Sequence, residues 1–115
     1  MKYYIIAGEA SGDLYGSKLI DEILSIDKKA EIRFWGGDNM IKSGGYNVKH
    51  IKKLAFMGFY EVLKNITTIV KNINLCKNDI KEFNPDSIIY IDYPGFNLKI
   101  CKWAKNNGYK NYYYI

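Results

Sequence analysis

Two short segments of the sequence combine carboxylates with glycines, and each follows an apolar run. The first is GEASGD at residues 8–13, after the apolar run 3–7, and the second is IDYPGFN at residues 91–97, at the end of the run 87–91. In an open parallel sheet, ligands bind outside the carboxyl ends of the strands, where the strand order reverses. For the common order 3-2-1-4-5 this point lies between the first and fourth strands. We therefore expect the two segments to face each other.

Asp92 occupies the end of the fourth expected strand, a position that favours a general base. A carboxylate there is expected to be partly desolvated, which strengthens it as a base. Pro94-Gly95 then turns the chain and places Asn97 near the start of the next helix. The alternative interpretation is that Asp92 only caps this helix or bonds to its own loop. The residues alone leave both interpretations open, because structural interactions also place acids at such positions.

The GEASGD segment does not fit a dinucleotide site. The fingerprint G-x-G-x-x-G would need glycine where Ala10 and Asp13 stand, and Glu9 and Asp13 would repel a pyrophosphate. The two acids suit sugar hydroxyls instead. The backbone N–H groups of Ser11 and Gly12 lie at an expected helix start, with Ser11 as N-cap, and could hold one anion. The segment therefore predicts a polyhydroxylated ligand that can carry a phosphate, the alternative being a helix start with ordinary capping acids.

The elements that must position these segments alternate between strand and helix. This alternation predicts an α/β fold, a Rossmann-like parallel sheet flanked by helices with right-handed crossovers. Because a finished domain rarely ends on an apolar core strand, we expect the 115 residues to be the front of a longer protein. The expected strands are 3–7, 31–35, 46–50, 87–91 and 111–115. The expected helices are 11–24, 38–43 and 58–83, with a last helix that opens in the turn 93–97 and runs to about 105.

The segment KKLAFMGFYEVLKNI at residues 52–66 is rich in large apolar side chains. Most of them are expected on the core side of the long helix, with Asn72 away from it. Phe56, Met57 and Tyr60 exceed what one core face needs. Flanked by several lysines, they could instead touch an anionic membrane surface or acyl chains. The residues at helical spacing on the expected core side are Phe59, Val62, Leu63, Ile66, Ile69, Val70 and Ile73.

The composition is that of one globular domain with a basic balance. The chain is 48% hydrophobic and carries a formal net charge of +5, with sixteen lysines and one arginine. This balance favours anionic partners or simply solubility, and no nucleic-acid motif accompanies it, so we expect no nucleic-acid partner. Cys76, Cys101 and the single histidine, His50, lie too far apart in sequence for a zinc motif. We find no signal-peptide pattern and no run of about 20 apolar residues.

Four motifs, taken together and in order, resemble the lipid-A-disaccharide synthases: AGEASGDLYG, FWGGDNM, LAFMGFYEVLKNI and IDYPGFN. The resemblance covers all 115 residues. It implies the N-terminal half of a GT-B glycosyltransferase, with residues 1–115 as a partial Rossmann-like domain on the acceptor side. The C-terminal UDP-binding domain is expected to be absent from this chain, which alone is expected to be inactive.

The resemblance also implies a reaction and its partners. UDP-2,3-diacylglucosamine would be the donor and 2,3-diacylglucosamine 1-phosphate the acceptor, giving the β(1→6) disaccharide of lipid A and UDP. No cofactor and no metal are expected. The full-length protein is expected to be a homodimer, cytoplasmic and peripheral on the cytoplasmic face of the inner membrane. Two alternatives stay open: a non-catalytic module that binds acceptor lipid or the membrane surface, and another GT-B or UDP-sugar enzyme.

The resemblance assigns roles to matching residues. Asp92 would be the general base that takes the proton from the acceptor 6-hydroxyl, and Asn97 could orient it. Some relatives carry an acid where this chain has Gly95, so a side-chain role there is not expected. The expected acceptor-binding residues are Glu9, Ser11, Gly12, Asp13 and Asn97, and the expected membrane or acyl contacts are Phe56, Met57, Phe59, Tyr60 and Leu63.

Overall fold

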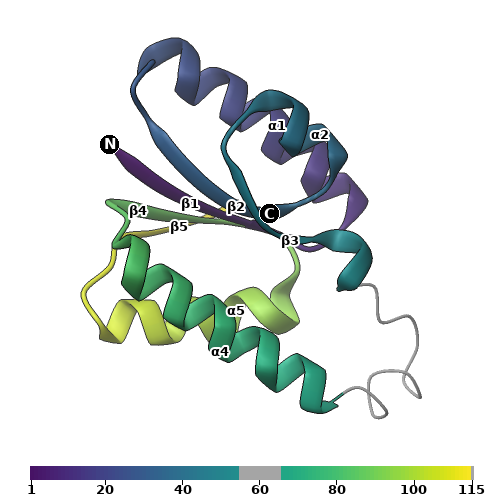
Figure 1. The fold of residues 1–115 in the computed structure, drawn as a ribbon. Coiled ribbons are helices and arrows are strands. Elements are labelled where there is room, and N and C mark those ends of the chain that lie inside the picture. The colour runs from purple at the N-terminus through teal and green to yellow at the C-terminus, as the bar shows by residue number, and fades with distance from the viewer. Residues whose placement is uncertain (55–65, 115) are drawn as a thin grey trace.

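The fold is that of a computed structural model, which describes residues 1–54 and 66–114. These residues contain a five-stranded sheet in the order β3-β2-β1-β4-β5, with every neighbouring pair parallel (Figure 1). The predicted α/β class and strand order are both confirmed. The strands are β1 (Lys2–Ala7), β2 (Glu31–Gly36), β3 (Tyr46–His50), β4 (Ser87–Ile91) and β5 (Asn111–Tyr114).

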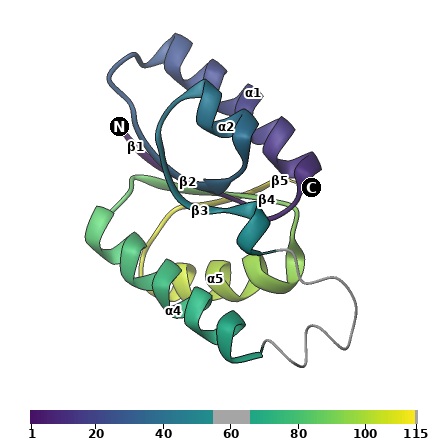
Figure 2. The same cartoon turned by 45° about the vertical axis from the view of Figure 1, so that its right-hand side comes forward.

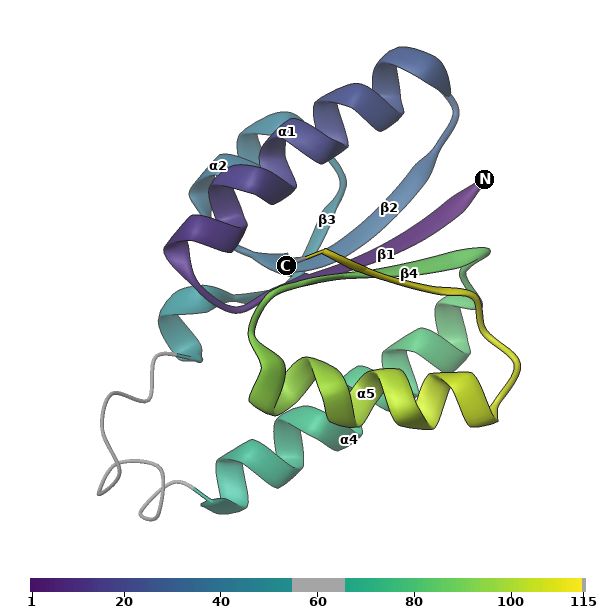
Figure 3. The ribbon, with the colours of Figure 1, turned by 180° about the vertical axis from the view of Figure 1, so that it is seen from behind.

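Helices cover the two faces of the sheet in pairs. Helices α1 (Ala10–Ile26) and α2 (Asp38–Ser43) lie on one face, and α4 (Ile66–Phe83) and α5 (Pro94–Asn106) lie on the other (Figures 1 and 3). A short 3-10 turn, η1 (Ile51–Lys53), follows β3. The turned view in Figure 2 shows the same two layers on either side of the sheet. This is the arrangement that right-handed crossovers between parallel strands require.

The central strand β1 divides the core into two clusters. Because successive side chains of a strand point to opposite faces, Ile5 and Ala7 pack under α1 and α2, whereas Tyr4 and Ile6 pack under α4 and α5. All four side chains are fully buried. Burial on both faces explains why this strand reads as a continuous apolar run in the sequence.

A chain of polar contacts fastens α4 to the sheet inside the second cluster. The Trp35 indole N–H donates to the Tyr4 hydroxyl at 2.9 Å, and this hydroxyl donates to the Asp79 carboxylate at 2.8 Å. Asp79 also forms a two-pronged salt bridge with Arg33, whose Nε lies 3.1 Å from it. Burial raises the pKa of Tyr4 far above its ordinary value, so the hydroxyl keeps its proton and remains a donor.

The predicted core side of the long helix is only partly right in the part that the structure describes. Ile73 packs against the buried core cluster and Ile69 is half-buried, as expected. Ile66 and Val70 are 58% and 52% exposed, while Asn72, expected on the outside, is only 4% exposed. Asn72, Cys76 and Ile80 form the buried side at a spacing of four residues. The reason is that the amino-terminal end of α4 projects past the sheet (Figure 1), so its apolar residues have no sheet to pack against. Residues 55–65, with Phe59, Val62 and Leu63, lie outside the described part.

We predict that Tyr4→Phe lowers the free energy of unfolding by about 1–3 kcal/mol, because the buried Trp35 indole N–H loses its acceptor. The measurement is urea denaturation followed by circular dichroism. The matched control is Tyr3→Phe, whose hydroxyl contacts only the Met1 sulfur, at 3.7 Å, among the described residues. Equal stability of the two variants would show that the Tyr4 hydroxyl does not hold this network together.

Candidate functional site

The two acid-bearing segments lie side by side at the carboxyl edge of the sheet. In the register of β1 and β4, Ala7 pairs with Ile91, so GEASGD and Asp92 begin at neighbouring positions. This confirms that the segments face each other. Between them is a cavity of about 170 Å³, lined by Ser11, Gly12, Tyr15, Ile91, Asp92 and Tyr114.

Asp92 has a left-handed backbone that three hydrogen bonds hold. Its φ is +46° and that of Tyr93 is +53°, values that residues other than glycine seldom adopt. The Asp92 N–H donates to the Tyr114 carbonyl at 2.8 Å. Its carbonyl accepts from Asn97 Nδ2 at 2.8 Å and from the Tyr113 hydroxyl at 2.7 Å. The chain therefore leaves β4 along one fixed path, with Asp92 lining the cavity.

The Asp92 side chain is exposed in the part of the chain that the structure describes. The expectation that it is partly desolvated is therefore wrong here. Its strand does end in buried residues, but the left-handed turn lifts the next side chain out of the apolar layer into the open cavity. The general-base role of Asp92 stays a prediction, and it rests on position rather than on burial.

Asn97 is fully buried and ties the two strand ends together. Its Nδ2 donates to the Ile6 carbonyl of β1 at 3.2 Å and to the Asp92 carbonyl at 2.8 Å. Among the described residues its Oδ1 has no hydrogen-bond partner. Asn97 thus contacts the backbone of Asp92, which suits the expected orienting role. Its contact with an acceptor stays a prediction.

Asp13 uses both carboxylate oxygens to cap the neighbouring helix α2. Oδ1 accepts from the N–H groups of Gly37 at 2.7 Å and Met40 at 3.0 Å, and Oδ2 accepts from that of Asn39 at 3.1 Å. A Cβ at Gly37 would lie only 2.9 Å from Oδ2, so this close approach requires glycine. Asp13 is 4% exposed and does not line the 170 Å³ cavity. Its expected contact with an acceptor is not tested by these bonds.

The start of α1 differs from the prediction. Glu9, not Ser11, is the N-cap, because the backbone is still extended at Glu9 and the Asp13 N–H closes the first turn on the Glu9 carbonyl at 2.9 Å. No side chain caps this end. The N–H groups of residues 10–12 precede the first intrahelical bond, as at any helix start. Ser11 and Gly12 line the cavity there, whereas Glu9 is exposed.

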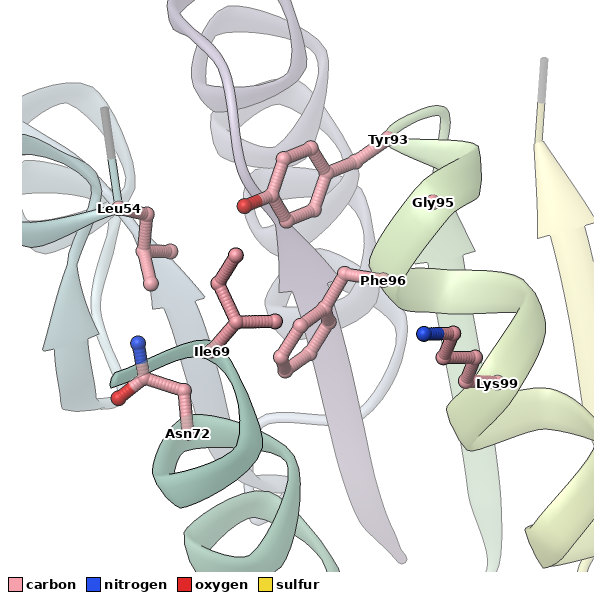
Figure 4. Close-up of a pocket in the computed structure, with 7 residues that line it drawn as sticks. All are labelled: Leu54, Ile69, Asn72, Tyr93, Gly95, Phe96 and Lys99. Atoms are coloured by element: carbon pink, nitrogen blue, oxygen red, sulfur yellow. The ribbon is translucent and has the colours of Figure 1, made fainter. Parts of the chain in front are cut away.

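A second cavity, of about 320 Å³, lies between α4 and the start of α5 (Figure 4). Tyr93 forms part of its wall and packs across Gly8, where a Cβ would lie 2.3 Å from the ring. The Tyr93 ring also stacks on Phe96 at 5.7 Å between centroids. Burial, and then the charge of Glu9, raise the pKa of Tyr93. The lining residues are Leu54, Ile69, Asn72, Tyr93, Gly95, Phe96 and Lys99.

Sequence reasoning missed the tyrosines of the site. Tyr93 lies between Asp92 and the predicted turn at Pro94-Gly95. That position indicates a change of chain direction, but it does not predict where the Tyr93 ring lies. Tyr113 was expected on a strand, but its contact with Asp92 depends on the β4–β5 register, in which Tyr90 pairs with Tyr113. Tyr15 and Tyr114 meet across the first cavity at 5.8 Å between ring centroids. The expected membrane residues Phe56, Met57, Phe59, Tyr60 and Leu63 lie outside the described part of the chain.

Within residues 1–54 and 66–114, no three His, Cys, Asp or Glu side chains come together as a metal ion would require. No helix in the same ranges has the length and apolar character needed to span a bilayer.

Comparisons with known proteins agree with the motifs. The family model described as "Lipid-A-disaccharide synthetase" matches residues 3–115. A lipid-A-disaccharide synthase of Geobacter metallireducens is 41% identical over 111 residues, covering 96% of this chain and 29% of the relative. That of Trichlorobacter lovleyi is 40% identical and that of Coxiella burnetii strain Dugway 5J108-111 is 37% identical, with similar coverage. The chain thus spans 29–30% of the length of these relatives.

We predict that Asp13→Ala lowers the free energy of unfolding by about 1–3 kcal/mol, because three N–H groups of the loop and α2 lose their acceptor. The measurement is urea denaturation. The control is Asp21→Ala, an exposed carboxylate in the same helix, which should change stability by less than about 0.5 kcal/mol. A loss no larger than that of the control would contradict the capping role.

Proposed function

This chain belongs to the lipid-A-disaccharide synthase family, and from that premise we propose that it is the acceptor side of a glycosyltransferase of lipid A biosynthesis. The reaction joins UDP-2,3-diacylglucosamine to 2,3-diacylglucosamine 1-phosphate through a β(1→6) bond and releases UDP. The observation that carries the proposal is Asp92, fixed in a left-handed turn beside the start of α1. The donor side belongs, in this proposal, to the part of the relatives that the chain does not cover.

Asp92 is the general base in this proposal. Its carboxylate accepts the proton of the acceptor 6-hydroxyl while that oxygen bonds to the anomeric carbon of the donor. The bond between this carbon and the UDP oxygen breaks, and UDP leaves with the electron pair. Exposure of the carboxylate to the cavity gives a hydroxyl access to it, and the hydrogen bonds to the Asp92 backbone support a fixed approach.

The other predicted residues divide into two groups. Ser11 and Gly12 line the cavity, and Glu9 lies exposed at the helix start, so we assign these three to the hydroxyls and phosphate of the acceptor. Asp13 and Asn97 are buried and bonded to backbone groups. We assign Asn97 to holding the two loops at the distance that the acceptor needs, and Asp13 to holding α2 against the start of α1. Direct contact of both side chains with the acceptor stays part of the proposal.

Contact with a membrane surface is a further part of the proposal. Ile66 and Val70 are large apolar residues left exposed at the amino-terminal end of α4, and the apolar segment 55–65 precedes them in the sequence. Together with the lysines that flank them in the sequence, Lys64 and Lys71, they suit the boundary of an anionic bilayer. We propose a peripheral position on the cytoplasmic face of the inner membrane. A homodimer of the longer protein is proposed on the family resemblance alone.

We predict that Asp92→Asn lowers UDP release by at least about 100-fold, because the amide cannot accept the hydroxyl proton. The protein for this measurement is a chimera in which residues 1–115 replace the matched segment of the Geobacter metallireducens relative. Acceptor binding should be retained. Residues 1–115 alone should release no UDP.

Asp21→Asn is the matched control, because Asp21 is an exposed carboxylate away from the cavity. Near-normal turnover by Asp92→Asn would remove Asp92 from the mechanism. A chimera that binds acceptor and never releases UDP would favour the non-catalytic binding module. Turnover of soluble UDP-sugars without acyl chains would favour another UDP-sugar enzyme.

We predict that Ile66→Ser with Val70→Ser reduces co-sedimentation of the chain with phosphatidylglycerol vesicles several-fold, since apolar area available for insertion is lost. The control is Ile26→Ser, which removes an 85% exposed apolar side chain at the carboxyl end of α1. An equal reduction of vesicle binding in the double variant and in Ile26→Ser would show that overall surface hydrophobicity, and not the amino-terminal end of α4, determines the binding.

A further inference from the structure

We propose that the 320 Å³ cavity between α4 and α5 binds one acyl chain of the acceptor glycolipid, with Lys99 at its mouth facing the polar end of that chain. The inference deepens the proposed function, and it rests on that function for the source of the chain. It concerns described residues only and assigns them the acyl part of a ligand whose sugar part lies at Asp92.

The walls of this cavity suit a hydrocarbon. Leu54 and Phe96 are 3% and 6% exposed, and the side chains of Ile69 and Tyr93 converge on the same space (Figure 4). Binding is favourable when a methylene chain displaces water from such an apolar surface. A sugar would lose its hydrogen bonds to water there without replacing them. The volume of about 320 Å³ lies at the small end of the usual range for ligand cavities. One unbranched chain is therefore the class of occupant that fits.

Polar groups are few and stand apart from one another. The Asn72 amide, 4% exposed, lies on the α4 side, and the Lys99 ammonium lies on the α5 side (Figure 4). A small number of polar groups in an apolar cavity fixes the orientation of a ligand. Because Lys99 is exposed, its charge favours the polar or anionic end of an amphiphile outside the cavity.

The turn after β4 places this cavity next to the proposed sugar site. Asp92 and Tyr93 are consecutive, and both have positive φ. Asp92 lines the 170 Å³ cavity, and Tyr93 lines the 320 Å³ cavity. A ligand with its sugar at Asp92 and an acyl chain past Tyr93 would contact both residues at once. An acylated sugar satisfies this requirement, and a soluble sugar does not.

Gly95 offers a way to close the cavity without disturbing the fold. A Cβ built at this lining residue meets no atom of residues 1–54 or 66–114 within 4 Å, and the φ of Gly95 is not in the left-handed region. Leucine should therefore be accommodated in the first turn of α5, with its side chain directed at the opening. Alanine at the same position should leave the opening nearly unchanged.

The experiment is a titration of ¹⁵N-labelled chain with sodium decanoate below its micelle concentration, followed by amide shifts. We expect saturable shifts around Leu54, Gly95 and Lys99, at least tenfold weaker binding in Gly95→Leu, and binding within about twofold of the natural chain in Gly95→Ala. Lys99→Gln should weaken decanoate binding several-fold but leave binding of the uncharged decyl maltoside unchanged. Lys102→Gln, on the same helix and outside the cavity, is the charge control.

Competition identifies the source of the chain. A short-chain 2,3-diacylglucosamine 1-phosphate should displace decanoate, whereas glucosamine 1-phosphate should not. Shifts that map elsewhere, undiminished binding in Gly95→Leu, or failure of the acylated sugar to compete would overturn the inference. If Gly95→Leu does not fold, the mapped shifts and the Lys99→Gln comparison still decide. UDP release by the Asp92 variants is a separate measurement, so the inference and the proposed function can fail independently.

Discussion

A single buried amide holds the functional edge of this molecule together. Asn97 donates from one nitrogen to carbonyl oxygens at the ends of two different strands, β1 and β4. The Asp92 carbonyl also accepts from the Tyr113 hydroxyl, but Asn97 is the fully buried side chain that bonds to both strand ends at once. The backbone N–H of Asn97 also closes the first turn of α5 on the Tyr93 carbonyl at 2.9 Å. The spacing of the two loops therefore depends on one side chain.

Asp92 and Tyr93, the two left-handed residues after β4, separate two cavities at this edge of the sheet. A single left-handed residue would redirect the chain once, but Asp92 and Tyr93 together direct consecutive side chains to different cavities. The conformation costs free energy at each residue. The hydrogen bonds that Asp92 accepts from Asn97 and Tyr113, and the one that its N–H donates to the Tyr114 carbonyl of β5, offset this cost. The packing of the Tyr93 ring over Gly8 then joins the two loops.

The sequence was sufficient for the order of the sheet and for the meeting of the two acid-bearing segments, because strand–helix alternation and crossover handedness leave few alternatives. Helix α2 was also predicted at its observed bounds, since glycines stand on both sides of it. The local sequence pattern did not predict the burial of side chains whose surroundings come from distant parts of the chain. Asn72 is buried on α4 although it interrupts the apolar periodicity, and Asp13 is bonded to α2 rather than open to solvent. The exposure of Asp92 depends on the positive φ angles of Asp92 and Tyr93, which the residue types at these two positions do not predict.

The capping of α2 by Asp13 has a consequence for how the molecule opens. Helix α2 has six residues, far fewer than a helix needs to persist on its own in water. Its amino end is completed by a carboxylate that belongs to the first turn of α1. Fraying of that first turn withdraws the cap, so the two helix starts form one cooperative unit in local unfolding. The start of α1, which lines the first cavity, and helix α2 thus share a single opening equilibrium.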